Sequence, residues 1–130
     1  MIHQQGYENY CASHRDGQTA GASPAQLVVV LMNGLLDELV RVRAHIDAGR
    51  YEQKGNGIAK CIAMFAGLTS MLDHDAKVEI VGRLTGLYEY CVRRLNEAGL
   101  TLDTALVDEV ASLVTTLRDA WAQIDQQHGR

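Results

Sequence analysis

Residues 23–49, SPAQLVVVLMNGLLDELVRVRAHIDAG, form the segment whose helical pattern is clearest in the sequence. Ser23 supplies an N-cap oxygen, Pro24 fits the first helical position, and Gln26 completes a capping box three residues on. Gly49 can end the helix in a left-handed conformation. Between these signals, apolar residues recur at spacings of three and four, which predicts one amphipathic helix. The stripe consists of Leu27, Leu31, Leu35, Leu39, Val42 and Ile46.

Three further segments repeat this spacing, and Pro24 is the only proline in the chain. The second predicted helix begins between residues 51 and 57 and ends before the polar stretch 73–75. The third ends at Gly99 as a C-cap, and the fourth begins at a cap provided by Thr101 or Asp103.

Four amphipathic helices joined by short turns bury their stripes most simply as an antiparallel up-and-down bundle. We therefore predict an all-α fold, a four-helix bundle over residues 23–125. Residues 1–22 form an N-terminal arm or a short additional helix, and residues 126–130 form a flexible tail.

The composition excludes several classes of function. A chain of 130 residues with 47% hydrophobic residues can bury one core, so a single domain is expected. A net charge of −4 gives no field that attracts nucleic acid. The sequence shows neither a secretory signal nor a run of about 20 apolar residues, so we expect a cytoplasmic protein without membrane insertion. The three cysteines lack the spacing of a metal site, and we expect no cofactor and no metal.

The sequence contains no pattern that indicates catalysis, and we predict that the chain is not an enzyme. The acidic residues Asp37, Glu38, Glu79 and Glu89 are expected to face solvent. Two alternatives remain open at this point. One is a histidine phosphotransfer bundle centred on His45, and the other is a structural bundle that only oligomerises.

Glycines inside the predicted helices are unusual, because each costs up to about 1 kcal/mol relative to alanine. They are Gly55, Gly57, Gly67, Gly82 and Gly86. Such glycines either allow two helices to pack closely or, together with Ala59, Ala63 and Ala66, leave a shallow apolar groove that accepts an outside segment.

Several motifs resemble the flagellin-specific export chaperones, the FliS family. The resemblance begins at Ser23 and Pro24 and continues through the second predicted helix to Leu72 and Asp73. It is most specific at Leu87-Tyr88-Glu89-Tyr90 and at Leu117-Arg118-Asp119-Ala120-Trp121, and Tyr10 matches an N-terminal tyrosine of the family. In all, it covers roughly residues 7–124.

This resemblance implies a chaperone that binds the C-terminal segment of flagellin, prevents its premature polymerisation and assists its delivery to the flagellar type III export apparatus. Components of that apparatus would be further partners, and the free chain would be a monomer or weak homodimer. We expect the flagellin groove on the second and third helices, with the N-terminal arm folding back over it until flagellin displaces the arm. The predicted binding residues are Tyr10, Ile58, Ile62, Phe65, Leu68, Leu84, Leu87 and Tyr88.

Overall fold

The computed structural model describes residues 23–72 and 78–128, and within them every regular element is a helix. The helices are α2 (Pro24–Asp47), α3 (Tyr51–Ser70), α4 (Val78–Thr101) and α5 (Thr104–His128). The all-α prediction is therefore confirmed. Tyr10 and the break at residues 73–75 lie outside the described residues.

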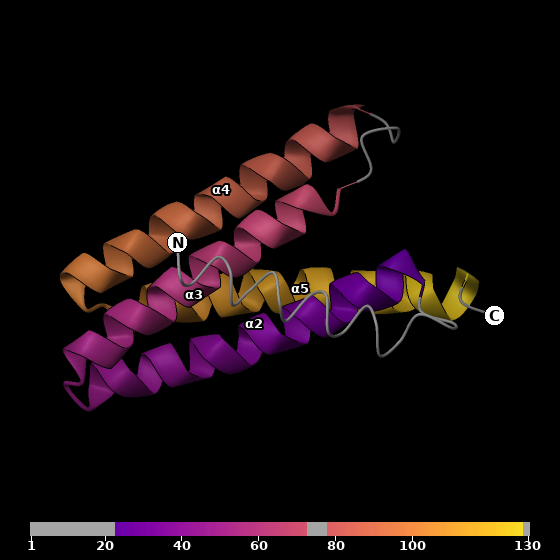
Figure 1. Ribbon diagram of the computed structural model, residues 1–130. Helices are drawn as coiled ribbons and strands as arrows, with labels where there is room; N and C mark the ends of the chain where they lie inside the picture. Colours follow the sequence, from indigo (N-terminus) through magenta and orange to yellow (C-terminus); the bar gives the residue numbers. More distant parts are fainter. Residues whose placement is uncertain (1–22, 73–77, 129–130) are drawn as a thin grey trace.

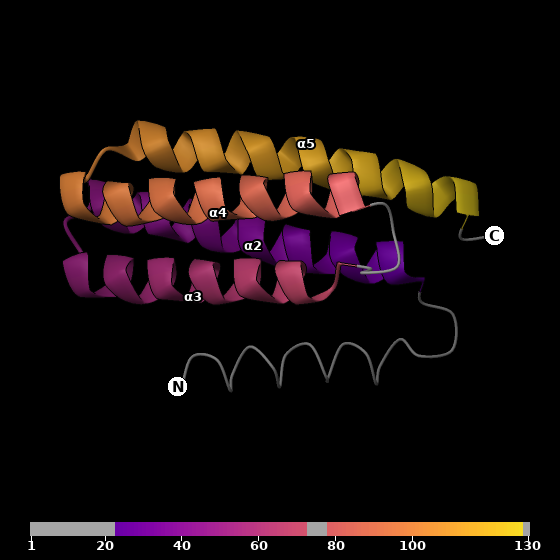
Figure 2. The same ribbon diagram turned by 90° about the horizontal axis from the view of Figure 1, so that it is seen from above.

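The four helices form an antiparallel up-and-down bundle, as predicted (Figures 1 and 2). Each helix packs against the next one in the chain, and α5 also packs against α2, which closes the ring. The contacts of α2 with its two neighbours are more extensive than those of α4. We call the end with the short turns at residues 48–50 and 102–103 the hairpin end, and the end where α2 begins the open end.

The start of α2 follows the capping signals of the sequence. The Ser23 hydroxyl accepts a hydrogen bond of 3.0 Å from the backbone N–H of Gln26, and Pro24 occupies the first turn. The same hydroxyl donates to Oδ1 of Asp125 over 2.7 Å, which ties the start of α2 to the end of α5. At the other end of α2, Gly49 has φ +72°, as its predicted left-handed role requires.

The end of α4 differs from the prediction. The helix continues through Gly99 to Thr101, and Leu102 takes the left-handed conformation with φ +61°. Gly99 serves a different purpose, because a Cβ there would lie 3.1 Å from Cδ1 of Ile58 on α3. The glycine therefore allows α3 and α4 to approach each other. The Asp103 side chain caps α5, accepting from the N–H of Ala105 at 3.0 Å.

The core runs along the axis of the bundle and is supplied by all four helices. Its large, fully buried members include Met32, Leu35, Phe65 and Leu95. The thiols of Cys61 and Cys91 are also fully buried, which confirms their predicted packing role. Burial raises the pKa of Cys61 to about 12 and that of Cys91 to about 11, so both are held as neutral thiols.

The expectation that Glu38 faces solvent is wrong, because only 6% of this residue is exposed. It lies beside α3, and its carboxylate contacts Arg41 at 2.7 Å and Lys60 at 3.6 Å. Gly57 makes this arrangement possible. A Cβ at position 57 would lie 2.7 Å from Cγ2 of Val42 and 3.4 Å from the Glu38 carboxylate. Close packing of α3 on α2 therefore explains this glycine.

Helix α5 extends further than the sequence predicts. Residues 126–128, which the sequence analysis assigns to a tail, continue α5. Across residues 23–72 and 78–128, no helix is both long enough and apolar enough to cross a membrane.

Candidate binding groove

We call the line along which two neighbouring helices meet a seam. Polar contacts between side chains close the seam between α2 and α5. Arg118 donates from Nη1 to Oδ1 of Asn33 over 2.9 Å, and Arg43 pairs with Asp108 nearer the hairpin end. The α2–α3 seam has its own link, the contact between Glu38 and Lys60.

The α4–α5 seam is closed by a cluster around Glu109. The Tyr90 hydroxyl donates to Oε2 of Glu109 and the Arg94 Nε donates to Oε1, both over 2.7 Å. These two donors favour the charged carboxylate and lower the pKa of Glu109, with the tyrosine making the larger contribution.

The α3–α4 seam is different. Among the residues that the structure describes, no ion pair or hydrogen bond joins a side chain of α3 to a side chain of α4. Within residues 23–72 and 78–128, the polar link across it is at the hairpin end, where Lys54 Nζ donates to the backbone oxygen of Gly99 over 2.8 Å. The other three seams each carry a link between two side chains, which the α3–α4 seam lacks among the described residues.

Two cavities follow one another along this seam, and together we call them the α3–α4 groove. The middle cavity measures about 390 Å³ and the hairpin-end cavity about 350 Å³. The middle cavity is lined by Ile62, Phe65, Ala66, Thr69, Tyr88, Glu89, Val92 and Arg93. The hairpin-end cavity is lined by Lys54, Gly55, Ile58, Asn96, Gly99 and Leu100.

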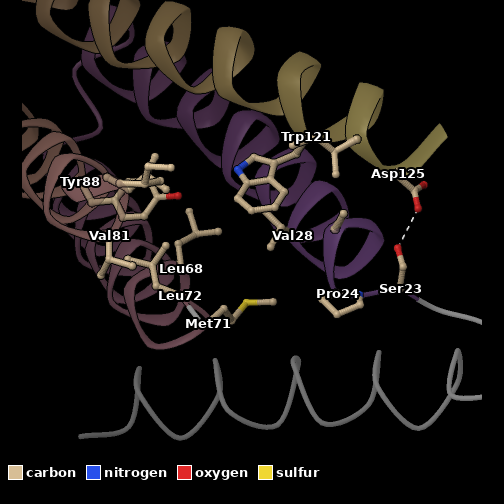
Figure 3. Close-up of a pocket in the computed structure, with 14 residues that line it drawn as sticks. Ser23, Pro24, Val28, Leu68, Met71, Leu72, Val81, Tyr88, Trp121 and Asp125 are labelled. Atoms are coloured by element: carbon tan, nitrogen blue, oxygen red, sulfur yellow. Dashed lines mark hydrogen bonds between the residues drawn. The ribbon is translucent and has the colours of Figure 1, made fainter. Parts of the chain in front are cut away.

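A third cavity of about 480 Å³, the open-end cavity, lies where all four helices approach the open end. Figure 3 shows Tyr88 from α4, Trp121 from α5 and Met71 beyond the end of α3 extending into the same space. The Ser23–Asp125 hydrogen bond lies at one side of it. Tyr88 lines both this cavity and the middle one, so the open-end cavity adjoins the α3–α4 groove.

Six of the predicted binding residues line these cavities. Ile58 belongs to the hairpin-end cavity, Ile62 and Phe65 to the middle one, Leu68 and Leu84 to the open-end one, and Tyr88 to two of them. Leu87 is half-buried and lines none of the three.

Burial divides these six residues into two groups. Ile58, Phe65, Leu68 and Tyr88 are buried in the core and contribute only one side to a cavity, whereas Ile62 and Leu84 are half-buried. The buried residues therefore determine the shape of the groove, and the exposed apolar surface in it comes mainly from the half-buried residues.

Ala66, which was expected beside the groove glycines, lines the middle cavity, whereas Val92, Glu89 and Arg93 were not predicted there. Val92 lies one turn after Tyr88 on α4, so helical spacing from a predicted residue could have found it. Gly55 was singled out as unusual. A Cβ there would meet no atom within 4 Å, so this glycine faces open space at the groove and not a neighbouring helix.

The groove is chemically suited to apolar contacts. Within the described part of the chain, no group of three or more His, Cys, Asp or Glu residues could hold a metal ion. His45 lies near the hairpin end of α2, where its Nδ1 accepts a 3.0 Å hydrogen bond from Nε of Arg50. The apolar side chains that line the cavities favour contact with the apolar face of an amphipathic helix.

Comparison with known proteins shows the family of this chain. The family described as "Flagellar protein FliS" matches residues 6–128. The chain belongs to the FliS family. Its relatives include the flagellar secretion chaperone FliSB of Pseudomonas aeruginosa, 36% identical over 82% of this chain and 84% of the relative. The flagellar secretion chaperone FliS of Salmonella typhimurium is 34% identical over 95% of this chain and 93% of its own length.

A solved structure described as a flagellar chaperone from bacteria has the same fold as this FliS family member. The TM-score is 0.77 at 14% identity, and the match covers 95% of this chain and 98% of the other. Membership of a family of secretion chaperones gives the chain an export chaperone role and confirms that it is not an enzyme.

Proposed function

We propose that this chain binds the C-terminal segment of flagellin in the α3–α4 groove. The observation that carries the proposal is the contrast between the seams. Three seams are closed by side-chain links, whereas the α3–α4 seam contains two cavities with largely apolar walls.

The length of the groove fits a helical guest. Its lining on α3 extends from Lys54 to Thr69, and the open-end cavity continues it to Leu72. At a rise of ~1.5 Å per residue this corresponds to roughly 27 Å, or about five helical turns. An amphipathic helix of that length can place its apolar stripe along the whole groove.

Covering such a stripe provides a chaperone mechanism. The resemblance to flagellin chaperones implies that the flagellin termini are amphipathic helices, whose exposed apolar stripes promote self-association. Burying one terminus in the groove prevents premature polymerisation. The ordering of a disordered segment offsets part of the binding free energy, by about 2–5 kcal/mol, so the complex remains releasable. We place this step in the cytoplasm, before delivery to the flagellar type III export apparatus, whose components would be further partners.

Co-purification tests the proposal. The chain should capture full-length flagellin and lose it when the flagellin C-terminus is truncated. Gel filtration should show a defined complex with a C-terminal flagellin peptide. Capture that survives the truncation, or self-association with no complex, contradicts the proposal and favours a bundle that only oligomerises.

A substitution in the groove tests its location. Ala66 is exposed on α3 and lines the middle cavity, so Ala66→Arg should fill the groove without disturbing the core. We expect the Kd for the flagellin peptide to rise at least about tenfold. Ala44→Arg on α2 is the matched control, because Ala44 is also exposed and lines none of the three cavities. Equal effects of the two variants would contradict this location.

The phosphotransfer alternative has its own test. The chain is incubated with a small phosphodonor and its mass is measured under conditions that preserve phosphohistidine. We expect no added phosphate at His45, and a stable phosphohistidine there would overturn the chaperone proposal.

A further inference from the structure

Helix α4 carries two pairs of oppositely charged residues at the same spacing. Glu79 and Arg83 are four residues apart, and so are Glu89 and Arg93, with the acidic residue first in both. This order and spacing favour an ion pair on a helix. Because the chemistry and geometry are matched, each pair serves as a reference for the other.

Only one of these pairs is closed. Arg83 Nη2 lies 2.6 Å from Oε1 of Glu79, and neither residue lines any of the three cavities. Glu89 and Arg93 form no ion pair with each other or with another residue in the described parts of the chain. The Arg93 guanidinium lies 5.9 Å from the ring centre of Tyr90 instead. Both Glu89 and Arg93 are exposed and line the middle cavity.

We propose that Glu89 and Arg93 set the direction in which the guest helix lies in the α3–α4 groove. This inference rests on the proposed function of that groove. The guest that fits is an amphipathic helix with one basic and one acidic side chain beside its apolar stripe, about one turn apart. In one direction the basic side chain meets Glu89 and the acidic one meets Arg93.

Reversing the direction of the guest helix would bring its basic side chain to Arg93 and its acidic side chain to Glu89, so that like charges meet. The apolar walls of the middle cavity, such as Ile62 and Val92, discriminate poorly between the two directions, because apolar burial is non-directional. A pair of opposite charges about 6 Å apart along α4 does discriminate, since complementary charges favour one register and like charges oppose the other.

The test exchanges the charges of each pair in the full-length chain. The variant E89R/R93E keeps net charge and spacing but inverts the order at the groove, and E79R/R83E makes the same change away from it. Binding of a flagellin C-terminal peptide is measured at about 50 mM and about 500 mM salt. We expect E89R/R93E to weaken binding about three- to tenfold at low salt and less at high salt, while E79R/R83E binds like the wild type.

Direction itself is read with a photo-crosslinker at the N-terminus of the peptide. With the wild type, crosslinks should form at one end of α3 and α4 only, and with E89R/R93E they should appear at both ends or at the opposite end. If E89R/R93E keeps both the affinity and the crosslinked end, or if E79R/R83E loses as much affinity, the inference is wrong. If the wild type fails to bind the peptide at all, the proposed function fails first and the inference fails with it.

Discussion

Gly57 is a residue at which the backbone of α3 approaches the side chains of α2 closely. The buried Val42 and the Glu38 carboxylate occupy the space that a Cβ would need. Gly82 on α4 is also inside a helix, but a Cβ there would meet nothing within 4 Å. The two glycines have the same intrinsic cost in a helix, so a comparison between them isolates the effect of packing.

We expect Gly57→Ala to lower the free energy of unfolding and Gly82→Ala to raise it. The added methyl at position 57 would be 2.7 Å from a β-branched side chain with no exposed surface to move into. Its overpacking should exceed the gain in helix propensity, for a net loss of about 1–2 kcal/mol. Gly82→Ala should gain about 0.5–1 kcal/mol. Urea unfolding measures both, and a stabilising Gly57→Ala would contradict the close approach of α3 to α2.

At the scale of the helices, Glu109 adds a pH-dependent contribution to the contact between α4 and α5. Hydrogen bonds from Tyr90 and Arg94 lower the pKa of this carboxyl in the folded chain. A lowered folded pKa stabilises the fold above the unfolded value of ~4.3, and this stabilisation disappears as the pH falls through the folded pKa.

We therefore expect Glu109→Gln to be less stable than the wild type at neutral pH and equally stable at strongly acidic pH. Tyr90→Phe removes the larger cause of the shift and should show part of the same effect. Thermal unfolding from about pH 7 to about pH 3 measures the difference. A stability difference that is constant over this range would show that the carboxylate is not what holds α4 to α5.

Helix α4 is held unevenly along its length. Its buried residues are Tyr88, Cys91, Leu95 and Ala98, and the part from Val78 to Leu87 contains only half-buried or exposed residues. Local opening requires less free energy where few apolar contacts are lost.

Amide hydrogen exchange should therefore be faster in residues 80–87 than in residues 91–98. Mass spectrometry of peptides from the two halves measures this difference in the free chain. Equal protection in both halves would contradict uneven anchoring. The pattern matters for binding because Val81 and Leu84, in the weakly held half, line the open-end cavity.

The helices could be predicted wherever a side chain determines their ends. Ser23 predicted the start of α2 because its hydroxyl makes the cap bond. The start of α3 carried no clear signal, since Arg50 makes no side-chain cap bond there. The end of α4 was predicted wrongly because Gly99 is needed for close packing, which sequence spacing does not distinguish from a C-cap.

The position of the groove could be predicted only in part. Apolar stripes identify which residues face other helices, but they do not show which seam stays open. That depends on links between residues far apart in the chain, such as Arg118 with Asn33 and Tyr90 with Glu109. Glu38 illustrates the same limit, because it borders the stripe at Leu39 and its burial depends on Gly57 of another helix.

At the scale of the whole molecule, the groove and the N-terminal arm are connected through Ser23. This residue begins the described chain, is anchored to Asp125, and lines the open-end cavity that adjoins the groove. Tyr10 precedes it by 13 residues, and a chain of that length spans at most roughly 45 Å. The groove and the open-end cavity together extend roughly 27 Å, so this length is sufficient for Tyr10 to reach the groove, as the proposal that the arm competes with flagellin requires.

Removal of residues 1–16 should therefore strengthen flagellin binding. If the arm covers the groove for part of the time, the apparent Kd equals the intrinsic Kd divided by the fraction of time that the groove is uncovered. An arm that covers the groove about nine-tenths of the time would therefore raise the Kd about tenfold, and its deletion would restore that affinity. Tyr10→Ala in the full-length chain should give part of that gain, since it leaves the rest of the arm in place. Calorimetry with the C-terminal flagellin peptide measures all three chains. Unchanged or weaker binding after the deletion would mean that the arm does not compete for the groove, and the α3–α4 groove would then have to be available to flagellin at all times.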